Sequence, residues 1–348
     1  MLLPHSPLTS GAAPGSYKQS AGDATWPICE NTQLMNRDQL KRLIQGPIAT
    51  VPSAFDGNFQ LDTAVMADLT EWWIERGLRT GTSVLKVAAA MGEGPDLNDD
   101  EWPRLLRAVV DAARGRVPVV CGLKTKNTLH TIDDARRAAD LGATGLQIDL
   151  PIFHHPTQDD YVRYFGDISA AIDIGIIIYN TWWFGAESIA PETLIRLSDA
   201  EHVVGVKWAT PPDTDYDAMR QFAHIFNVID NSGDPVRSHR MGARGYISSI
   251  IPAWPEHDLQ VWALLEERRY DEAQALYDRI NGALRRFEIE LARESGGYRL
   301  PKALMEVIGR PVGPPRPPTL PLSTEQLHRL HGLMAGLDWP GVTPLVAA

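Results

Sequence analysis

Eight short apolar runs, each bounded by turn residues, alternate with amphipathic helical segments along most of the chain. Continuous apolar runs are typical of parallel strands that helices cover on the outer face. Eight such units fit a closed barrel better than an open doubly wound sheet, whose Gly-rich phosphate loop is absent after the first run. The pattern therefore predicts an α/β fold, a (β/α)8 TIM barrel with a C-terminal helical appendage. The runs lie at Pro47–Val51, Val84–Ala90, Val117–Cys121, Gly145–Leu150, Ile174–Tyr179, Val203–Trp208, Ile225–Ile229 and Gly245–Ile250.

The remaining parts of the chain flank this barrel. Residues 1–34 are rich in small and polar residues and show no periodicity, which predicts a flexible N-terminal arm. The barrel is predicted to span residues 35–252, and residues 253–348 are predicted to form C-terminal helices packed on it. In that last part the periodicity indicates one long helix at Tyr270–Glu294. A Pro-rich link, Arg310–Pro318, precedes the final helix at Ser323–Ala335.

Composition excludes several classes of partner. The chain has 348 residues and a formal net charge of -11, which argues against nucleic acid or an anionic membrane as its main partner. Its two cysteines, Cys29 and Cys121, allow at most one disulfide and are expected to be free thiols. No segment has the apolar region of a signal peptide or the length of a transmembrane helix. We therefore expect a cytoplasmic protein that acts on small molecules.

Two residues stand out at the carboxyl ends of the strands, where the active site of a barrel lies. Lys207 follows the apolar run Val203–Val206, where burial of an unpaired ammonium is costly and a lowered pKa is expected. A neutral amine attacks a ketone to form a Schiff base, although a lysine at a strand end can instead extend to solvent. Tyr179 ends the preceding run and would transfer protons, unless it is an ordinary tyrosine with a satisfied hydroxyl.

A set of short motifs occurs in a fixed order along the chain. The motifs are Gly46–Pro52 with Phe55–Gly57, Met91–Glu93, Gly115–Gly122 with Asn127–Thr128, Tyr179–Asn180, Gly205–Lys207, and Met241–Gly245 with Ile247–Ser248. This ordered set resembles the dihydrodipicolinate synthase / N-acetylneuraminate lyase superfamily over roughly residues 35–335. The resemblance implies a (β/α)8 barrel, a Schiff base at Lys207 without a separate cofactor, and proton transfer by Tyr179. It also implies a homo-oligomer, either a tetramer or a dimer.

The chain departs from that family where substrate would be held. Ala90 and Met91 stand where the family has two threonines before Gly92, so backbone N–H groups of this loop would have to bind the carboxylate of the oxo acid. Phe153 follows Ile152 in the segment where dihydrodipicolinate synthase has a second tyrosine. Phe184 aligns with an arginine that binds the carboxylate of the aldehyde substrate. The sequence therefore predicts that the proton relay and the second anion site of dihydrodipicolinate synthase are both absent, which argues against a role in lysine biosynthesis.

Aromatic side chains replace the lost polar ones. Trp182, Trp183, Phe184 and Phe153 are predicted to line the mouth of the barrel, which favours a bulky aromatic or hydrophobic aldehyde. The superfamily that the sequence resembles includes hydratase-aldolases. The resemblance, together with these aromatic residues, implies such a lyase, acting on pyruvate or another 2-oxo acid with a bulky aldehyde. An alternative for the tryptophan pair is packing against a neighbouring subunit.

Other polar residues at strand ends complete the predicted site. His154, Asn180 and Ser248 are expected to contact substrate. His154 and His155 invite a metal-site interpretation, but adjacent residues of an extended segment point to opposite sides and no further ligands accompany them. We therefore predict no metal site. Glu93 is expected to bind the backbone N–H groups of its own loop rather than substrate.

Two other functions are consistent with the sequence. A dehydratase of a 3-deoxy-2-oxo sugar acid, with or without decarboxylation, would keep the Schiff base. Its polar substrate would favour Ser, Thr or Asn where this chain has Trp and Phe. A non-catalytic barrel that binds a 2-oxo acid is the third possibility. The presence of both Lys207 and Tyr179 argues against it, because a binding protein does not need a buried reactive amine.

Overall fold

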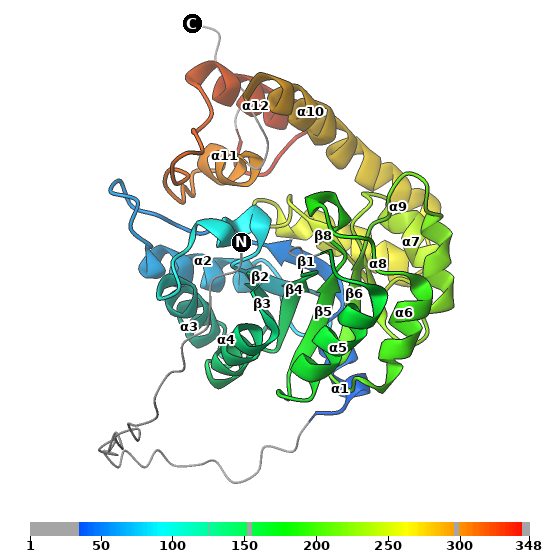
Figure 1. The fold of residues 1–348 in the computed structure, drawn as a ribbon. Coiled ribbons are helices and arrows are strands. Elements are labelled where there is room, and N and C mark those ends of the chain that lie inside the picture. Colours follow the sequence, from blue (N-terminus) through cyan, green and yellow to red (C-terminus); the bar gives the residue numbers. More distant parts are fainter. Residues whose placement is uncertain (1–34, 125, 152–154, 296–298, 343–348) are drawn as a thin grey trace, which may run out of the picture. The chain divides into compact units, whose positions relative to one another are not determined.

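A closed barrel of parallel strands forms the centre of the protein (Figure 1). The structure is a computed structural model that describes residues 35–124, 126–151, 155–295 and 299–342. The strands follow one another around the barrel in chain order, which confirms the predicted (β/α)8 fold. They are β1 (Gly46–Thr50), β2 (Val84–Val87), β3 (Val119–Leu123), β4 (Gly145–Asp149), β5 (Gly175–Tyr179), β6 (Val203–Trp208), β7 (Asn227–Asp230) and β8 (Gly245–Ser248).

Helices cover the outside of the barrel and continue beyond its last strand (Figure 1). Capping side chains set several of their starts. The Asp62 carboxylate, for example, accepts hydrogen bonds from the N–H groups of Ala64 and Val65 at the start of α2. None of the described helices has the length and apolar character needed to cross a bilayer. The α-helices are α1 (Arg37–Leu43), α2 (Thr63–Glu75), α3 (Glu101–Ala113), α4 (Thr128–Asp140), α5 (Gln158–Ser169), α6 (Pro191–Arg196), α7 (Pro235–Arg240), α8 (Pro255–Glu266), α9 (Tyr270–Tyr277), α10 (Ala283–Ser295), α11 (Leu300–Val307) and α12 (Thr324–Gly336).

The long helix predicted at Tyr270–Glu294 is interrupted. A π-helical turn, Asp278–Gly282, separates α9 from α10. Within it, the Asn281 amide donates a hydrogen bond to the Tyr277 carbonyl at 3.2 Å. A π-turn inserts one extra residue without breaking the helical direction, so the apolar periodicity alone does not reveal it. Such turns are frequent at functional sites.

The barrel interior is apolar near the N-terminal ends of the strands. Helix α1 closes this end, where Leu40 and the following Ile44 pack against interior side chains of the strands. Those side chains are Ile48, Val84, Val120, Ile177, Val204 and Ile229. Side chains alternate between the two faces of a strand, so residues two positions further along also face the interior. There the chain has Thr50, Lys86 and Tyr179, and the interior becomes polar.

Neighbouring strands bring more polar side chains into this upper layer. Asp149 of β4 is paired in register with Tyr179 of β5, which is paired with Lys207 of β6. Residues paired in register point to the same side of the sheet, here the interior. Gln147 lies two residues before Asp149, and its side-chain carbonyl accepts a hydrogen bond from the Lys86 ammonium at 2.7 Å. The carboxyl half of the barrel therefore encloses a cluster of ionisable groups.

Two buried ion pairs tie the C-terminal helices to the barrel. Lys302 of α11 lies 2.8 Å from the carboxylate of Glu93, which follows β2. Arg316, in the Pro-rich link, donates to both carboxylate oxygens of Glu101 in α3 at 2.6 Å each.

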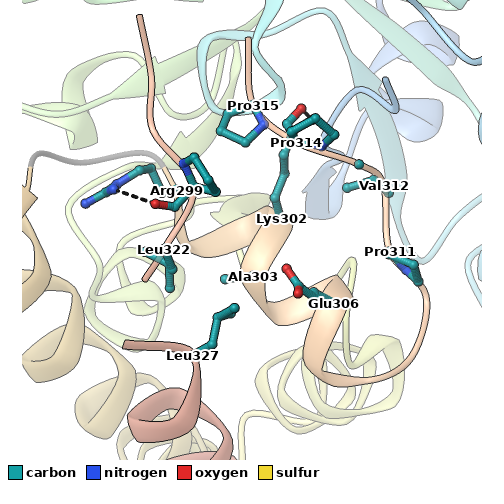
Figure 2. A pocket seen from close by; sticks show the side chains of 12 residues that line it. Arg299, Lys302, Ala303, Glu306, Pro311, Val312, Pro314, Pro315, Leu322 and Leu327 are labelled. Carbon is teal, nitrogen blue, oxygen red and sulfur yellow. Dashed lines mark hydrogen bonds between the residues drawn. The ribbon is translucent and has the colours of Figure 1, made fainter. Parts of the chain in front are cut away.

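A cavity of about 290 Å³ lies between α11 and residues 311–315 of the link (Figure 2). Of the described residues that line it, none belongs to a strand of the barrel, so the candidate site lies elsewhere.

Candidate active site

Lys207 and Tyr179 lie side by side at the mouth of the barrel, which confirms that their strands are adjacent. The Lys207 amine is 3.5 Å from the centre of the Tyr179 ring, and both side chains are buried. Burial lowers the pKa of Lys207 well below its usual value, the charge of Lys86 lowers it further, and the Asp149 carboxylate opposes both. Lys207 therefore loses its proton more readily than an exposed lysine. The neutral amine is the form that attacks a carbonyl carbon.

Three polar residues that the sequence analysis missed share this interior. Lys86 is 1% exposed, and burial lowers its pKa to about 7, while Asp149 acts in the opposite direction. Burial raises the pKa of Asp149 to about 6, against the effect of Lys207 and Lys86. Thr50 is paired in register with Lys86, and its buried hydroxyl has no hydrogen-bond partner among the described residues. Perturbed ionisable groups gathered in one cleft are typical of active sites.

The turn after β2 offers backbone donors at the mouth. Ala90, Met91 and Gly92 form a short 3-10 turn, in which the Gly92 N–H group already donates at 2.8 Å. The first N–H groups of a helical turn have no acceptor within it, so those of Ala90 and Met91 are suited to an anion. The Ser53 hydroxyl donates to the Gly92 carbonyl at 2.6 Å. A Cβ atom on Gly92 would lie 2.4 Å from the Val51 oxygen, so this turn packs directly on the first strand segment.

Glu93 has a different partner from the one expected. Its carboxylate pairs with the Lys302 ammonium of α11 rather than with N–H groups of its own loop. Burial raises the pKa of Glu93, and the charge of Lys302 opposes this rise. The ion pair of Glu93 therefore connects the turn after β2 to the C-terminal helices. Because the two residues are far apart in the sequence, the sequence alone does not predict this contact.

The aromatic residues predicted for the mouth form a wall beside Tyr179. Trp182–Phe184 make a 3-10 turn after β5. The Trp183 ring contacts the Tyr179 ring edge-on at 5.5 Å and the Trp182 ring at 5.4 Å. Phe184 is 49% exposed. The Trp182 indole N–H is buried and has no hydrogen-bond partner among the residues described. A large apolar surface thus adjoins the phenol.

Asn180 and Ser248, both predicted to contact substrate, hold loops in place. The Asn180 amide is fully buried and donates to the Ser188 hydroxyl and the Ala209 carbonyl at 3.0 Å each. The Ser248 oxygen accepts hydrogen bonds at 3.1 Å from two backbone N–H groups of the loop after β8. These contacts give both residues a positioning role for the strand-end loops.

A polar cavity of about 370 Å³ opens at the ends of β7 and β8. Burial raises the pKa of its Glu288 carboxyl, and Arg285 opposes this rise. Four of its polar residues come from the π-turn and α10, beyond the strand ends of the barrel, so the strand pattern does not predict them; they are Asp278, Asn281, Arg285 and Glu288. Its lining includes Met91, Asn231, Ser248, Asn281, Arg285 and Glu288.

Some sequence predictions lie outside the described residues. Phe153, His154 and Cys29 are among them, so their predicted roles stay predictions. Within the described ranges no group of three or more His, Cys, Asp or Glu side chains is arranged to hold a metal ion. Cys121 is a buried free thiol, as expected, and burial raises its pKa.

Comparison with known proteins identifies the family. Residues 43–336 match the model of the dihydrodipicolinate synthetase family. The chain belongs to this family. The 4-hydroxy-tetrahydrodipicolinate synthase of Acidothermus cellulolyticus is 31% identical over 289 residues, which cover 82% of this chain and 89% of that protein. The synthase of the same name from Coxiella burnetii is 28% identical over 246 residues, which cover 68% of this chain and 82% of that protein.

Solved structures of the dihydrodipicolinate synthetase family share the barrel. The chloride-inhibited dihydrodipicolinate synthase of Acinetobacter baumannii, complexed with pyruvate, superposes with a TM-score of 0.75 at 24% identity. The match covers 85% of this chain and 99% of that one. As a member of the dihydrodipicolinate synthetase family, the chain is a lyase of the Schiff-base class that acts on small molecules.

Proposed function

We propose that Lys207 forms a Schiff base with pyruvate or another 2-oxo acid and that Tyr179 moves the protons of the reaction. The observation that carries this proposal is the buried Lys207 amine, 3.5 Å from the Tyr179 ring. The neutral amine adds to the C2 carbonyl, and loss of water from the carbinolamine gives an iminium. The iminium accepts the electron pair of the C3–C4 bond, which releases an aldehyde and leaves an enamine; condensation is the reverse. A phenol beside the amine can give and take the protons.

The carboxylate of the oxo acid would be held at the β2 turn. The N–H groups of Ala90 and Met91 begin that turn and can donate to an anion. Their side chains cannot replace the two threonine hydroxyls of the family. The unpartnered hydroxyl of Thr50, which faces the interior beside Lys86, is a candidate for that missing donor. A buried hydroxyl without a partner gains a hydrogen bond when a substrate oxygen enters.

The second substrate is proposed to be a bulky aromatic or hydrophobic aldehyde, as in hydratase-aldolases. The edge-on contact of Trp183 with Tyr179 supports this, because it puts an apolar ring next to the group that would protonate the aldehyde oxygen. Trp182 and Phe184 extend the same surface. Phe153 and His154 are proposed to complete it from the loop after β4.

A second candidate function is supported by the polar cavity at β7 and β8. Asn231, Asn281 and Arg285 offer amide and guanidinium groups that suit hydroxyls or a second carboxylate. A 3-deoxy-2-oxo sugar acid would place such groups beyond the Schiff base. The candidate reaction is then dehydration, in which the C3 proton and the C4 hydroxyl leave together as water.

Reductive trapping tests the Schiff base. Intact-protein mass is measured after borohydride treatment, with and without pyruvate, on the wild type, Lys207→Ala and the matched control Lys41→Ala. Lys41 lies on α1, at the opposite end of the barrel, and its ammonium binds the Ile225 carbonyl at 2.8 Å. A pyruvate adduct in the wild type and control, but not in Lys207→Ala, is expected. An adduct that persists in Lys207→Ala, or its absence with every 2-oxo acid, would contradict the proposal.

Two variants separate the candidate substrates. Trp183→Leu should raise the KM of an aryl aldehyde more than it slows iminium formation with pyruvate. Arg285→Met should instead raise the KM of a sugar acid and leave the aryl aldehyde unaffected. Equal losses in both steps for Trp183→Leu would show that the ring supports Tyr179 or the fold rather than the aldehyde.

We also propose that the protein works in the cytoplasm as a homo-oligomer. The half-exposed Phe184 and the 74% exposed Leu129 support a contact with a second copy, because large apolar side chains of this exposure suit an interface. Light scattering after size exclusion measures the oligomeric state. A monomer at micromolar concentration would contradict this part of the proposal.

A further inference from the structure

Lys86 is a second lysine inside the barrel, and the family's Schiff-base mechanism leaves it without a role. We propose that Lys86 is a positioning residue for the Schiff-base lysine: its ammonium, balanced by Asp149, keeps the Lys207 amine free of its proton. The inference deepens the proposed function and rests on it for its catalytic consequence. The protonation of Lys207, however, can be measured without any substrate.

The geometry of Lys86 supports an electrostatic role. Its side chain faces the barrel interior from β2, directly above the apolar Val84, and is 1% exposed. The ammonium donates to the Gln147 side chain of β4 at 2.7 Å. It reaches across β3 at the level of Gly122, which is paired in register with Gln147 and packs against the backbone of Ala88 and Ala89. A buried lysine with a fixed neutral acceptor keeps its charge in place rather than extending to solvent.

The charged and titratable groups around Lys207 can be counted strand by strand. Tyr179 comes from β5, Asp149 from β4 and Lys86 from β2, whereas the register partner of Lys207 on β7 is the apolar Ile229. Among the described residues, the interior thus has two amines and one carboxylate around Lys207. Two ammonium groups in a medium of low polarity repel each other, and one carboxylate can balance only one of them.

The shared positive charge is better placed on Lys86 than on Lys207. Lys86 has the Gln147 oxygen as an acceptor, while Lys207 lies over the Tyr179 ring. That ring face attracts a cation, but only weakly compared with a hydrogen-bonded acceptor and a balancing carboxylate. Iminium formation later returns a positive charge to Lys207. The same repulsion then favours loss of the Lys86 proton, which leaves as water with the hydroxide expelled from the carbinolamine, so the interior holds one such charge before and after the step.

The pH dependence of Lys207 carbamylation by cyanate tests the inference, because cyanate reacts with the neutral amine. Peptide mass spectrometry gives the extent at Lys207 in the wild type, Lys86→Met, Asp149→Asn and the matched control Lys41→Met. Without Lys86, Lys207 is the one ammonium of the described residues that is left to balance Asp149, so the pH midpoint of Lys207 carbamylation should rise by about one to two pH units. Asp149→Asn should lower the midpoint, and Lys41→Met should leave it unchanged.

Several outcomes would overturn the inference. One is a pH midpoint of Lys207 carbamylation that is unchanged or lowered in Lys86→Met. Another is a raised midpoint in Asp149→Asn, and a third is no carbamylation of wild-type Lys207 at any pH. A purely structural role of Lys86 would reduce the yield of folded protein without moving the midpoint. Lys86→Gln, which can still bond Gln147, replaces Lys86→Met if circular dichroism shows that the latter does not fold. Borohydride trapping with pyruvate is run in parallel. If the wild type forms no pyruvate adduct but the carbamylation midpoints shift as expected, the proposed function is contradicted and the role of Lys86 is not.

Discussion

Replacement of Arg316 by Gln is expected to destabilise the protein far more than loss of an exposed ion pair. The guanidinium donates to both oxygens of Glu101 at 2.6 Å and also to the Asp96 carbonyl at 2.8 Å. The Arg316 and Glu101 side chains are only 13% and 6% exposed. Removal of one partner of a buried pair leaves an uncompensated charge and costs ~3–5 kcal/mol. Arg76→Gln is the matched control, since Arg76 and its partner Glu256 are both 45% exposed and such pairs contribute ~0–1 kcal/mol.

Thermal melting measures this difference. At ~2.1 cal/mol/K of unfolding entropy per residue, each kcal/mol shifts the Tm of a protein of this size by ~1.4 °C, so Arg316→Gln should melt roughly 4–7 °C lower and Arg76→Gln within ~1.5 °C of wild type. The double variant with Glu101→Gln should be more stable than Arg316→Gln alone, because it has no orphaned carboxylate.

The pH dependence of the same variant gives a second check. The hydrogen bonds from Arg316 lower the pKa of Glu101 in the folded protein. A carboxyl group whose pKa is lower in the folded than in the unfolded protein stabilises the fold at pH values above its unfolded pKa. This stabilisation is lost as pH falls through the folded pKa. The Tm difference between wild type and Arg316→Gln should therefore shrink as pH falls below about 4.5, the ordinary carboxyl range. A Tm difference that is the same at pH 7 and pH 4, or strict additivity with Glu101→Gln, would refute this reasoning.

Three further variants test the site. Tyr179→Phe should slow turnover ~10²–10⁴-fold while borohydride still traps the pyruvate adduct, and full activity would exclude an acid/base role. Gly94→Ala would put a Cβ atom 1.7 Å from the Ala88 oxygen, so the β2 turn must move. We expect a raised KM for the 2-oxo acid in steady-state assays, and an unchanged KM would show that the turn does not bind it. Asn180→Ala should lower Tm because it leaves the buried loop groups that Asn180 binds without hydrogen-bond partners. A change confined to KM would instead indicate substrate contact.

Much of the fold was predictable because its signal is local. Each strand is a short apolar run between turn residues, and the predicted Gly145–Leu150 differs from β4 by one residue at its end. The interruption at Asp278–Gly282 was not predictable, since a π-turn preserves the helical direction. The ion pair of Glu93 with Lys302 joins residues far apart in the sequence, and nothing local in either segment indicates the other.

The candidate site was only partly predictable, because some of its polar side chains come from within apolar strands. Lys207 and Tyr179 stand at strand ends, where barrels place their chemistry. Lys86 stands within Val84–Val87, a strand whose other residues are all apolar. Alternation along the strand puts Lys86 on the same face as Val84, and the same reasoning applies to Asp149 at the end of β4. Strand-by-strand alternation would have found both.

In the part of the chain that the structure describes, the apolar seal that α1 forms with Ile48, Val84 and Val120 closes one end of the barrel and leaves the mouth as its opening. Water and buffer therefore reach the ionisable groups above it from the mouth alone. A substrate bound to Lys207 would occupy that mouth and isolate the groups behind it from bulk solvent. Protons removed during turnover would then be confined with the substrate and return to it. In deuterated water we would expect pyruvate recovered from the enzyme to keep part of its C3 hydrogen, because a proton removed from C3 when the enamine forms would return before it exchanges.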